Sequence, residues 1–404
     1  MHLSRAICQI FLIGSVGAAQ AQTWHALDGS PRSAAKVSPE IVKFMKAAQV
    51  PGLGVAVIEN GQVVWQHAFG DADPRNGKAL QTDTIMYGAS LTKAAFAYLV
   101  MQLVDEGVID LDAPITKLLA KPLPDYPDYA DLKGDPRWQQ FTPRMLLTHS
   151  SGMLNWRWIN DDKKLTINYA PGSRYVYSGE GIQVMQLIVE ERTGRSAGEL
   201  MQERVFNRFG MKDTSMVWRS DFASHTTAHF DTDGTPIEHQ QRRRPRAAGS
   251  MDTTVADYAK FLAGVLRGEG LSPASHKAML APQLAIVQPQ QFPSHWPGET
   301  DVNRNIGLSI GIGWPVYNSP VGPAFFKEGG DPGTKNFSIG FQRPRSGVVM
   351  LSNSSNTDKL FFPALETMMG RTCLPWFWMG YVPYDKPEWR GLDKRDHPPQ
   401  LECK

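Results

Sequence analysis

Hydrophobic and polar residues follow a strand pattern near both ends of the chain and a helical pattern in its middle. Two runs rich in apolar residues, Leu53 to Ile58 and Gln62 to Ala68, flank Asn60-Gly61. This pattern predicts two strands joined by a tight hairpin turn. Apolar strand patterns return near the C-terminus, whereas helical patterns fill the interval from about 110 to 251. We therefore expect one antiparallel sheet built from both chain ends, flanked by helices, with an inserted, mostly helical domain.

The expected helices are amphipathic or apolar segments that stop at glycine, and together with the sheet they give an α/β (α+β) fold class. Ser38 and Pro39 have the residue types of a helix cap and a first helical turn. The helices are expected at 38–48, 90–107, 181–191, 197–209, 254–266 and 358–369, and the C-terminal strands at 307–314, 336–342 and 348–353.

The segment that follows Tyr87 is the most apolar of the expected helices. From Ala94 to Val104 it is apolar nearly all round, which is typical of a helix buried inside a large domain. Ser90 and Lys93 precede this run and share one helical face. A buried lysine is costly unless it has a partner or a task. A neutral amine can activate a serine hydroxyl as a nucleophile, so we hypothesise that this helix carries the active site.

The composition is that of an ordinary globular protein. The 404 residues are 42% hydrophobic and 20% charged, with a net charge of +2. This balance gives no reason to expect a nucleic-acid partner, and the length fits two domains or one core with an insertion. No spacing of cysteine or histidine resembles a metal site, so we expect neither metal nor cofactor. The oligomeric state stays open.

The first 21 residues have the pattern of a secretory signal peptide. An apolar stretch from Ala6 to Val16 precedes Ala19-Gln20-Ala21, which predicts cleavage after Ala21 and a periplasmic or secreted protein. The alternative is a retained anchor, although the stretch is too short to span a bilayer. Residues 22–37 are polar and are expected to form an unanchored lead-in.

Once the signal is removed, two cysteines remain, Cys373 and Cys403. In an oxidising compartment they favour either one disulfide that ties down the C-terminal tail or two free thiols. The tail from 374 to 404 is rich in aromatic residues and proline. We expect it to lie over the surface as a strap rather than to form a folded unit.

The Ser-x-x-Lys spacing alone is weak evidence, because the chain contains it twice. The second copy, Ser33 to Lys36, lies in the polar lead-in and precedes no buried helix. Two further stretches support Ser90. Tyr177 lies on a tight loop in front of an amphipathic helix, and Lys327 stands two residues before Gly329 at the entrance to a strand. A glycine there would allow a substrate to lie close along the strand edge.

These motifs, in this order, resemble the serine β-lactamase and penicillin-binding-protein family. The match is to the class C β-lactamase-related branch, which also contains esterases and D-amino-acid peptidases. Its three motifs, Ser-x-x-Lys, Tyr-x-Asn and Lys-Thr-Gly or His-x-Gly, correspond to Ser90–Lys93, Tyr177–Gly179 and Lys327–Gly329. The resemblance runs from about 38 to 370, so we expect a catalytic domain at 38–373.

The resemblance implies a role for each motif residue. Ser90 would be the nucleophile that forms an acyl-enzyme, and Lys93 and Tyr177 would carry protons. Their pKa values would have to be lowered, by burial for Lys93 and by nearby cations for Tyr177. The amides of Ser90 and Gly330 would form the oxyanion hole. Lys327 would hold positive charge near the tyrosine and a substrate carboxylate.

Two positions depart from the family pattern. Gly179 replaces the usual asparagine, which removes a side-chain amide that steadies a substrate amide. Glu328 replaces the usual Thr or Ser and would repel an anionic substrate or pair with Lys327. Both changes favour an esterase or peptidase over an efficient β-lactamase. The alternative is a catalytically inactive penicillin-binding-like protein that binds cell-wall fragments or a partner. An α/β-hydrolase is a third, disfavoured alternative.

Each candidate residue also has a plainer interpretation. Ser90 can be an ordinary helix cap, Tyr177 a packed loop tyrosine and Lys327 a surface lysine. A structural role is expected for His149, at a helix end. The arginine run 242–246 can be a solvated loop or can recruit an acidic substrate. Cleft lining and simple packing are equally open for four aromatic residues, Tyr126, Tyr129, Trp156 and Trp158.

Overall fold

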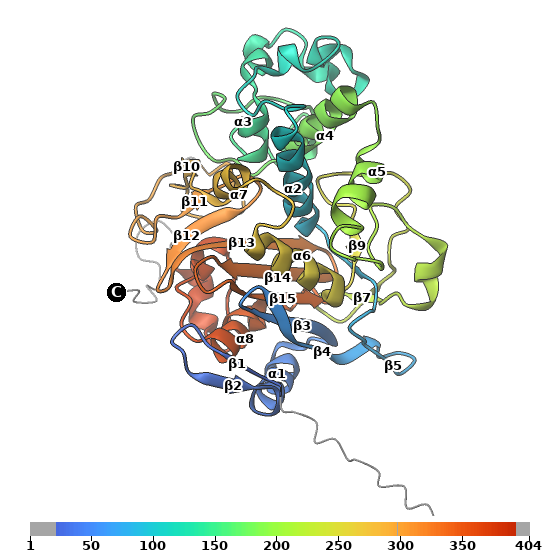
Figure 1. Ribbon diagram of the computed structural model, residues 1–404, viewed down its shortest axis with the longest axis vertical. Coiled ribbons are helices and arrows are strands. Elements are labelled where there is room, and N and C mark those ends of the chain that lie inside the picture. Colours follow the sequence, from blue (N-terminus) through green and yellow to red (C-terminus); the bar gives the residue numbers. More distant parts are fainter. Residues whose placement is uncertain (1–21, 297, 393–404) are drawn as a thin grey trace, which may run out of the picture.

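The computed structural model describes residues 22–296 and 298–392, and Figure 1 shows a sheet-containing half below a helical half. The predicted signal peptide lies outside the described residues. The main sheet has nine strands in the order β10-β11-β12-β13-β14-β15-β3-β4-β5, and every neighbouring pair is antiparallel. Strands from both chain ends meet where β15 pairs with β3, which confirms the predicted fold class.

The main sheet is built around five long neighbouring strands, β13, β14, β15, β3 and β4, with shorter strands at its edges. Its members are β3 (Gly52–Glu59), β4 (Gln62–Asp73), β5 (Lys78–Ala79), β10 (Leu284–Ala285), β11 (Ser309–Ile310), β12 (Pro315–Ser319), β13 (Gly322–Asp331), β14 (Thr334–Phe341) and β15 (Ser346–Ser352). Three small pairs complete the strands: β1 (Thr23–His25) with β2 (Pro31–Ser33), β6 (Met86–Tyr87) with β9 (Asp252–Thr253), and β7 (His229–Phe230) with β8 (Pro236–Ile237).

The helices lie on both faces of the sheet and fill the upper half of the molecule (Figure 1). They are α1 (Ala34–Ala48), α2 (Leu91–Asp105), α3 (Pro143–Leu147), α4 (Gly179–Thr193), α5 (Ala197–Met201), α6 (Val255–Arg267), α7 (Pro273–Leu280), α8 (Asp358–Met369) and α9 (Trp376–Met379). Short 3-10 turns occur at Ile115–Lys117, Leu123–Asp125, Pro127–Leu132, Pro136–Gln140, Arg157–Ile159, Ser220–Ser224 and Pro387–Gly391, and a π-helical turn at Gln202–Phe206.

The predicted hairpin forms where the sequence indicates it. Asn60 and Gly61 have φ angles of 52° and 74°, the left-handed geometry that such a two-residue turn requires. The strand predicted at 307–314 is shorter than expected, because only Ser309–Ile310 joins the sheet. The helix predicted at 197–209 is also divided, since a π-helical turn follows α5 at Met201.

Alternation along β3 separates two hydrophobic cores. Ala56 and Ile58 face the core that contains α2 and α6. Leu53, Val55 and Val57 face the opposite core, which contains α1 and α8. Residues on a strand point alternately to its two faces, so this nearly unbroken apolar run fits a strand covered on both sides.

The lead-in predicted at 22–37 is wrong as an unanchored segment. It forms β1, β2 and the start of α1, which begins at Ala34 rather than at Ser38. Trp24 is buried and stacks on Trp65 with ring centroids 5.0 Å apart. One buried tryptophan therefore anchors a segment whose remaining residues are mostly polar.

The strap predicted for the C-terminal tail is also wrong over its described part, because Trp376 and Trp378 are only 1% and 2% exposed. They join the same core as α1 and α8. Cys373 is disulfide-bonded. Since Cys8 and Cys403 lie outside the described residues, the pairing with Cys403 stays a prediction. Among the described residues, no helix is long and apolar enough to cross a membrane.

Candidate active site

Ser90 stands at the turn that opens α2. Every residue of the helix from Leu91 to Leu103 is buried, which confirms the predicted central helix. The residue before the serine, Ala89, has a φ of 46°, a left-handed conformation that is uncommon outside glycine. Such strain persists only where the surroundings enforce it, and it is concentrated at functional sites. Here it turns the chain sharply from β6 into the helix.

Lys93 is 1% exposed and points back to Ser90. Its Nζ donates to Ser90 Oγ at 2.9 Å and to the backbone oxygen of Ala248 at 2.5 Å. Burial lowers the pKa of Lys93, and Lys327 lowers it further, while Tyr177 opposes the shift. The lowered pKa and the contact with Ser90 Oγ both suit Lys93 to accept the proton of the serine.

Tyr177 lies between the two lysines. The Nζ atoms of Lys93 and Lys327 are 5.0 and 5.1 Å from the centroid of its ring. Burial would raise the pKa of Tyr177, but the two cations outweigh burial and the net pKa is lowered. The directions for Lys93 and Tyr177 are therefore those that the family resemblance implies.

His149 supports the tyrosine without joining the proton path. Its ring lies 4.4 Å from the ring of Tyr177, measured between centroids, and its Nδ1 accepts a hydrogen bond from the amide of Ser178 at 3.2 Å. Burial and the nearby lysines keep the pKa of His149 well below its usual value, so the ring is neutral. This geometry agrees with the structural role expected for it.

Lys327 and Glu328 form a buried ion pair beside Tyr177. Lys327 Nζ lies 3.4 Å from Glu328 Oε1 and donates to the backbone oxygen of Glu328 at 2.7 Å. Gln291 donates to the same carboxylate oxygen, while Oε2 of Glu328 is buried without a partner. Of the two outcomes expected for Glu328, pairing with Lys327 is the one observed. The positive charge of Lys327 is therefore paired with the carboxylate of its neighbour Glu328.

Gly329 explains why β13 can pass the opening of α2. A Cβ built on this residue would lie 2.5 Å from the oxygen of Gly88 and 3.1 Å from the nitrogen of Ser90. The missing side chain at Gly329 therefore permits the contact with the turn that carries Ser90, and the approach of a substrate along this strand edge stays a prediction. Strand β12 pairs only with Gly322–Phe325 of β13, so within the described chain this side of the strand has no partner beyond Phe325.

The space that a side chain would occupy at Gly179 is filled by a tryptophan. A Cβ on Gly179 would lie within 2.7 to 2.9 Å of three atoms of the Trp156 ring. That ring stacks on Trp158 with centroids 5.0 Å apart, and it lies 6.0 Å from Lys93 Nζ. At the position of the family's asparagine, the site therefore has an apolar aromatic wall. Both tryptophans line the cleft, the first of the two interpretations considered for them.

A cavity of about 1280 Å³ opens over these residues. Ser90, Lys93, Tyr177, Glu328 and Gly330 all line it, so the structure brings most of the predicted site residues to one place. Among the lining residues that sequence analysis missed are four from the loop between β10 and β11 and from the tail, where no motif marks them: Gln291, Phe292, Met379 and Tyr381. Phe292 contacts the ring of Tyr177 edge-on, with centroids 5.1 Å apart.

This arrangement offers a hydroxyl, two perturbed proton carriers and backbone amides, the groups that acyl transfer needs. Within residues 22–296 and 298–392, no group of three or more histidine, cysteine or acidic residues is arranged to hold a metal ion. The chemistry available from the side chains themselves is nucleophilic attack by serine, with Lys93 and Tyr177 as candidate proton carriers.

Sequence comparison places the chain among known proteins. A profile of the beta-lactamase family matches residues 38–367. Penicillin-binding protein 4 of Amycolatopsis lactamdurans is 24% identical over 80% of this chain and 85% of that protein. Lovastatin esterase of Penicillium rubens is 26% identical over 78% of this chain and 82% of that protein. The similarities span most of each protein.

Structural comparison gives the same fold. The octameric penicillin-binding protein homologue from Pyrococcus abyssi superimposes with a TM-score of 0.66 and 22% sequence identity. The match covers 84% of this chain and 78% of that one. The arrangement of the main sheet, the helical half and the opening of α2 therefore follows an architecture already known from solved structures.

Proposed function

The chain belongs to the beta-lactamase family of serine hydrolases, and we propose that it cleaves an ester or amide bond through an acyl-serine intermediate on Ser90. The observation that carries this proposal is the contact of Lys93 Nζ with Ser90 Oγ at 2.9 Å, at the start of a buried helix that lines the cavity. A lysine without a task would be an expensive residue at this position.

The first half of the reaction forms the acyl-enzyme. Ser90 Oγ attacks the substrate carbonyl carbon while its proton passes to Lys93 or Tyr177. Negative charge develops on the carbonyl oxygen, where the amides of Ser90 and Gly330 donate hydrogen bonds; such donors each lower the barrier by about 3 kcal/mol. The same proton then goes to the departing alcohol or amine as the carbonyl–heteroatom bond breaks.

The second half releases the acid. Water attacks the acyl carbon, and the same proton carriers accept its proton and return one to Ser90 Oγ as the acyl bond breaks. No group beyond the chain's own residues is needed for either half. The cycle ends with free Ser90 and a carboxylic acid product.

The two unusual positions favour esters over β-lactams. At Gly179 the amide-binding side chain is replaced by the Trp156 ring, and at Glu328 a carboxylate neutralises Lys327. An ester needs less hydrogen-bond support of its alkoxy group than an amide does of its nitrogen. Lovastatin esterase, one of the relatives, supports the ester as substrate class.

We also propose that the protein is exported, with residues 1–21 as a signal peptide and action in the periplasm or outside the cell. The support is the apolar stretch followed by Ala19-Gln20-Ala21. N-terminal sequencing of the protein from its natural host tests this, with Gln22 as the expected first residue.

A parallel turnover screen tests the function. Short-chain p-nitrophenyl esters, nitrocefin and D-amino-acid amides are offered to wild type and to Ser90→Ala, and intact mass is measured after a fluorophosphonate probe. We expect ester turnover and one adduct in wild type and neither in the variant. Binding without turnover of any of the three classes would instead establish the inactive penicillin-binding-like protein.

A further inference from the structure

The arginine-rich loop 242–246 forms one wall of the catalytic cavity. Four arginines line the space above Ser90: Arg242, Arg243, Arg244 and Arg246. Sequence analysis left two interpretations of this run, a solvated loop and a recruiter of acidic substrates. The first does not explain why all four arginines line the cavity that holds the nucleophile.

Arg242 fixes the loop in place. Its guanidinium carbon lies 3.4 Å from the centroid of the Tyr87 ring, and its Nη1 lies 3.4 Å from Oδ1 of the buried Asp252. Further along, the amide of Ala247 donates to Oε1 of Gln186 at 2.7 Å. Because both ends of the run are anchored, the arginines between them are presented from a defined backbone.

The other three arginines have free guanidinium groups. Arg243, Arg244 and Arg246 are exposed, and in the described part of the chain none of their side chains makes an ion pair or hydrogen bond. Arginine stays protonated at any physiological pH. Three permanent charges therefore face the cavity without a protein partner.

The rest of the cavity lining offers a substrate anion little unpaired positive charge. Lys327, which the family resemblance assigned to a substrate carboxylate, is paired with Glu328. The remaining carboxyl groups of the cavity are Asp231, Asp331 and Asp358. Burial raises the pKa of Asp331 and Asp358, and Lys335 opposes part of that rise. Unpaired positive charge is thus concentrated on the loop wall.

The loop is joined directly to the nucleophile's turn. Ala248 accepts a hydrogen bond from Lys93 at 2.5 Å, and Gly249 accepts one from the Tyr87 hydroxyl at 2.6 Å. Arg246 is two residues from Ala248, so their Cα atoms are at most about 7.6 Å apart. Arg246 is therefore close along the chain to the residue that contacts Lys93, and it lines the same cavity as Ser90.

We propose that Arg243, Arg244 and Arg246 form a subsite for the carboxylate of a small anionic ester or amide whose scissile carbonyl lies at Ser90. This inference rests on the proposed function and names its substrate class. Guanidinium groups bind carboxylates through paired N–H donors, which suits the planar fork of arginine. The loop arginines, rather than Lys327, bind the substrate carboxylate, because Lys327 is already paired with Glu328.

Two matched pairs of esters test the subsite. Mono-p-nitrophenyl glutarate and p-nitrophenyl pentanoate differ in a carboxylate on the acyl side. Likewise, 4-acetoxybenzoate and methyl 4-acetoxybenzoate differ in one on the leaving-group side. The quantity measured is the ratio of kcat/KM for the anionic member to kcat/KM for the neutral one. Arg243→Gln/Arg244→Gln/Arg246→Gln should lower this ratio about tenfold or more for at least one pair.

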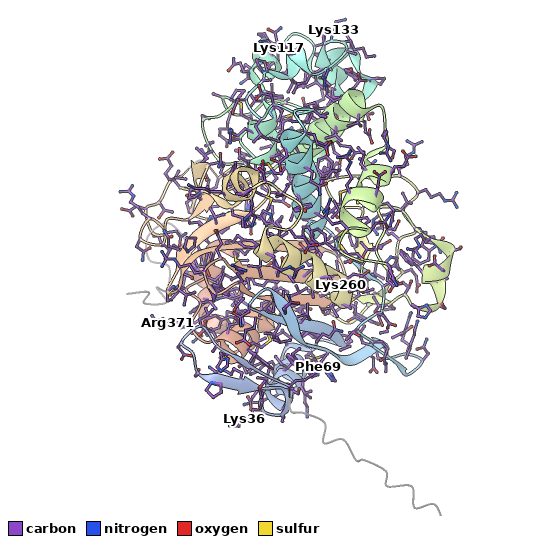
Figure 2. The ribbon with its side chains drawn as sticks, in the orientation of Figure 1. Lys36, Phe69, Lys117, Lys133, Lys260 and Arg371 are labelled. Atoms are coloured by element: carbon purple, nitrogen blue, oxygen red, sulfur yellow. The ribbon has the colours of Figure 1, made fainter. Side chains whose placement is uncertain are left out.

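A lysine triple variant is the matched control. Lys36, Lys117 and Lys133 are exposed at the bottom and top of the molecule, away from the loop, and Lys36→Gln/Lys117→Gln/Lys133→Gln removes the same total charge (Figure 2). It should leave both ratios within about twofold of wild type. An unchanged ratio for both pairs in the arginine variant, or an equal fall in the lysine variant, overturns the subsite. No turnover of any of the four esters by wild type would instead refute the proposed hydrolase.

Discussion

Two helices of this protein begin with the same four-residue pattern, and only one of them opens into a cavity. Ser33 precedes α1 and Ser90 precedes α2; each helix has 15 residues, and neither serine makes a side-chain cap hydrogen bond. The lysines three positions after these serines differ in exposure and in their contact with the serine. Lys36 is exposed at the lower surface, whereas Lys93 is 1% exposed and bonded to its serine (Figure 2).

The difference shows that the Ser-x-x-Lys spacing only brings the lysine within reach of the serine, while the environment determines the pKa of the lysine. Both lysines lie one helical turn from a serine, as the helix geometry requires. Only Lys93 loses its water shell and lies near a second cation, Lys327, and these two effects lower its pKa. The same substitution made at Lys93 and at Lys36 therefore measures the effect of the environment of the lysine, because its spacing from the serine is the same.

The largest expected effect is the difference in kcat/KM between two variants, in which Lys93 or Lys36 is replaced by methionine, a residue of similar length. Lys93→Met should lower kcat/KM on an active ester by about 10²- to 10⁴-fold, because a positioned proton carrier contributes that much. Lys36→Met should stay within about twofold of wild type. Steady-state kinetics on one p-nitrophenyl ester measures both variants under the same conditions.

Circular dichroism of both variants accompanies the kinetics, so that a misfolded protein is not mistaken for an inactive one. If a folded Lys93→Met variant keeps more than a tenth of the wild-type rate, the contrast between the two helices has no catalytic meaning, and Tyr177 alone would then carry the proton.

A smaller effect should appear when the second cation is removed. Lys327 lowers the pKa of both Lys93 and Tyr177. Its loss disfavours the phenolate and favours the ammonium, so both groups hold their protons to higher pH. The acidic limb of kcat/KM in Lys327→Gln should therefore move upward by roughly one pH unit, which costs about tenfold in rate below the limb. The full pH–rate profile measures this shift.

Removing Lys327 leaves Glu328 buried without its cation, so a second variant guards against misfolding. Lys327→Gln/Glu328→Gln removes both charges, and because the lysine outweighs the carboxylate in its effect on Tyr177, the limb should still move upward. A limb that stays in place in both variants would show that the titrating group lies outside this cluster.

The sheet and the active helix could be predicted because their information is local. The Asn60-Gly61 turn and the apolar run of α2 are visible in short windows of sequence, and periodicity determines where such segments belong. The motif residues could be assigned because Ser90, Tyr177 and Lys327 occur in a fixed order. Each marks its own position by residue type.

What the sequence concealed depends on contacts between distant segments. Nothing near Gly179 shows that the Trp156 ring fills its missing side chain, and nothing near Glu328 shows that Gln291 holds it. The lead-in and the tail were misjudged for the same reason. Trp24 and Trp376 are anchored by surfaces that come from elsewhere in the chain, which hydrophobic periodicity does not reveal.

The smallest expected effect is on stability, and it follows from the sign of the shift at Lys93. Its pKa in the folded protein is lowered from 10.5, so over the intervening pH range the unfolded chain binds the proton more tightly. Folding is therefore penalised at low pH, and the penalty disappears as pH rises toward the pKa of the lysine in the unfolded chain.

Between neutral pH and pH 10, the free energy of unfolding of wild type relative to Lys93→Met should rise, by at most about 1.4 kcal/mol per pH unit. Urea titrations in a Tyr177→Phe background, where the coupled phenol is absent, measure this difference. A flat result would mean that the buried lysine keeps its proton, and the two helix openings would then differ in exposure without differing in chemistry.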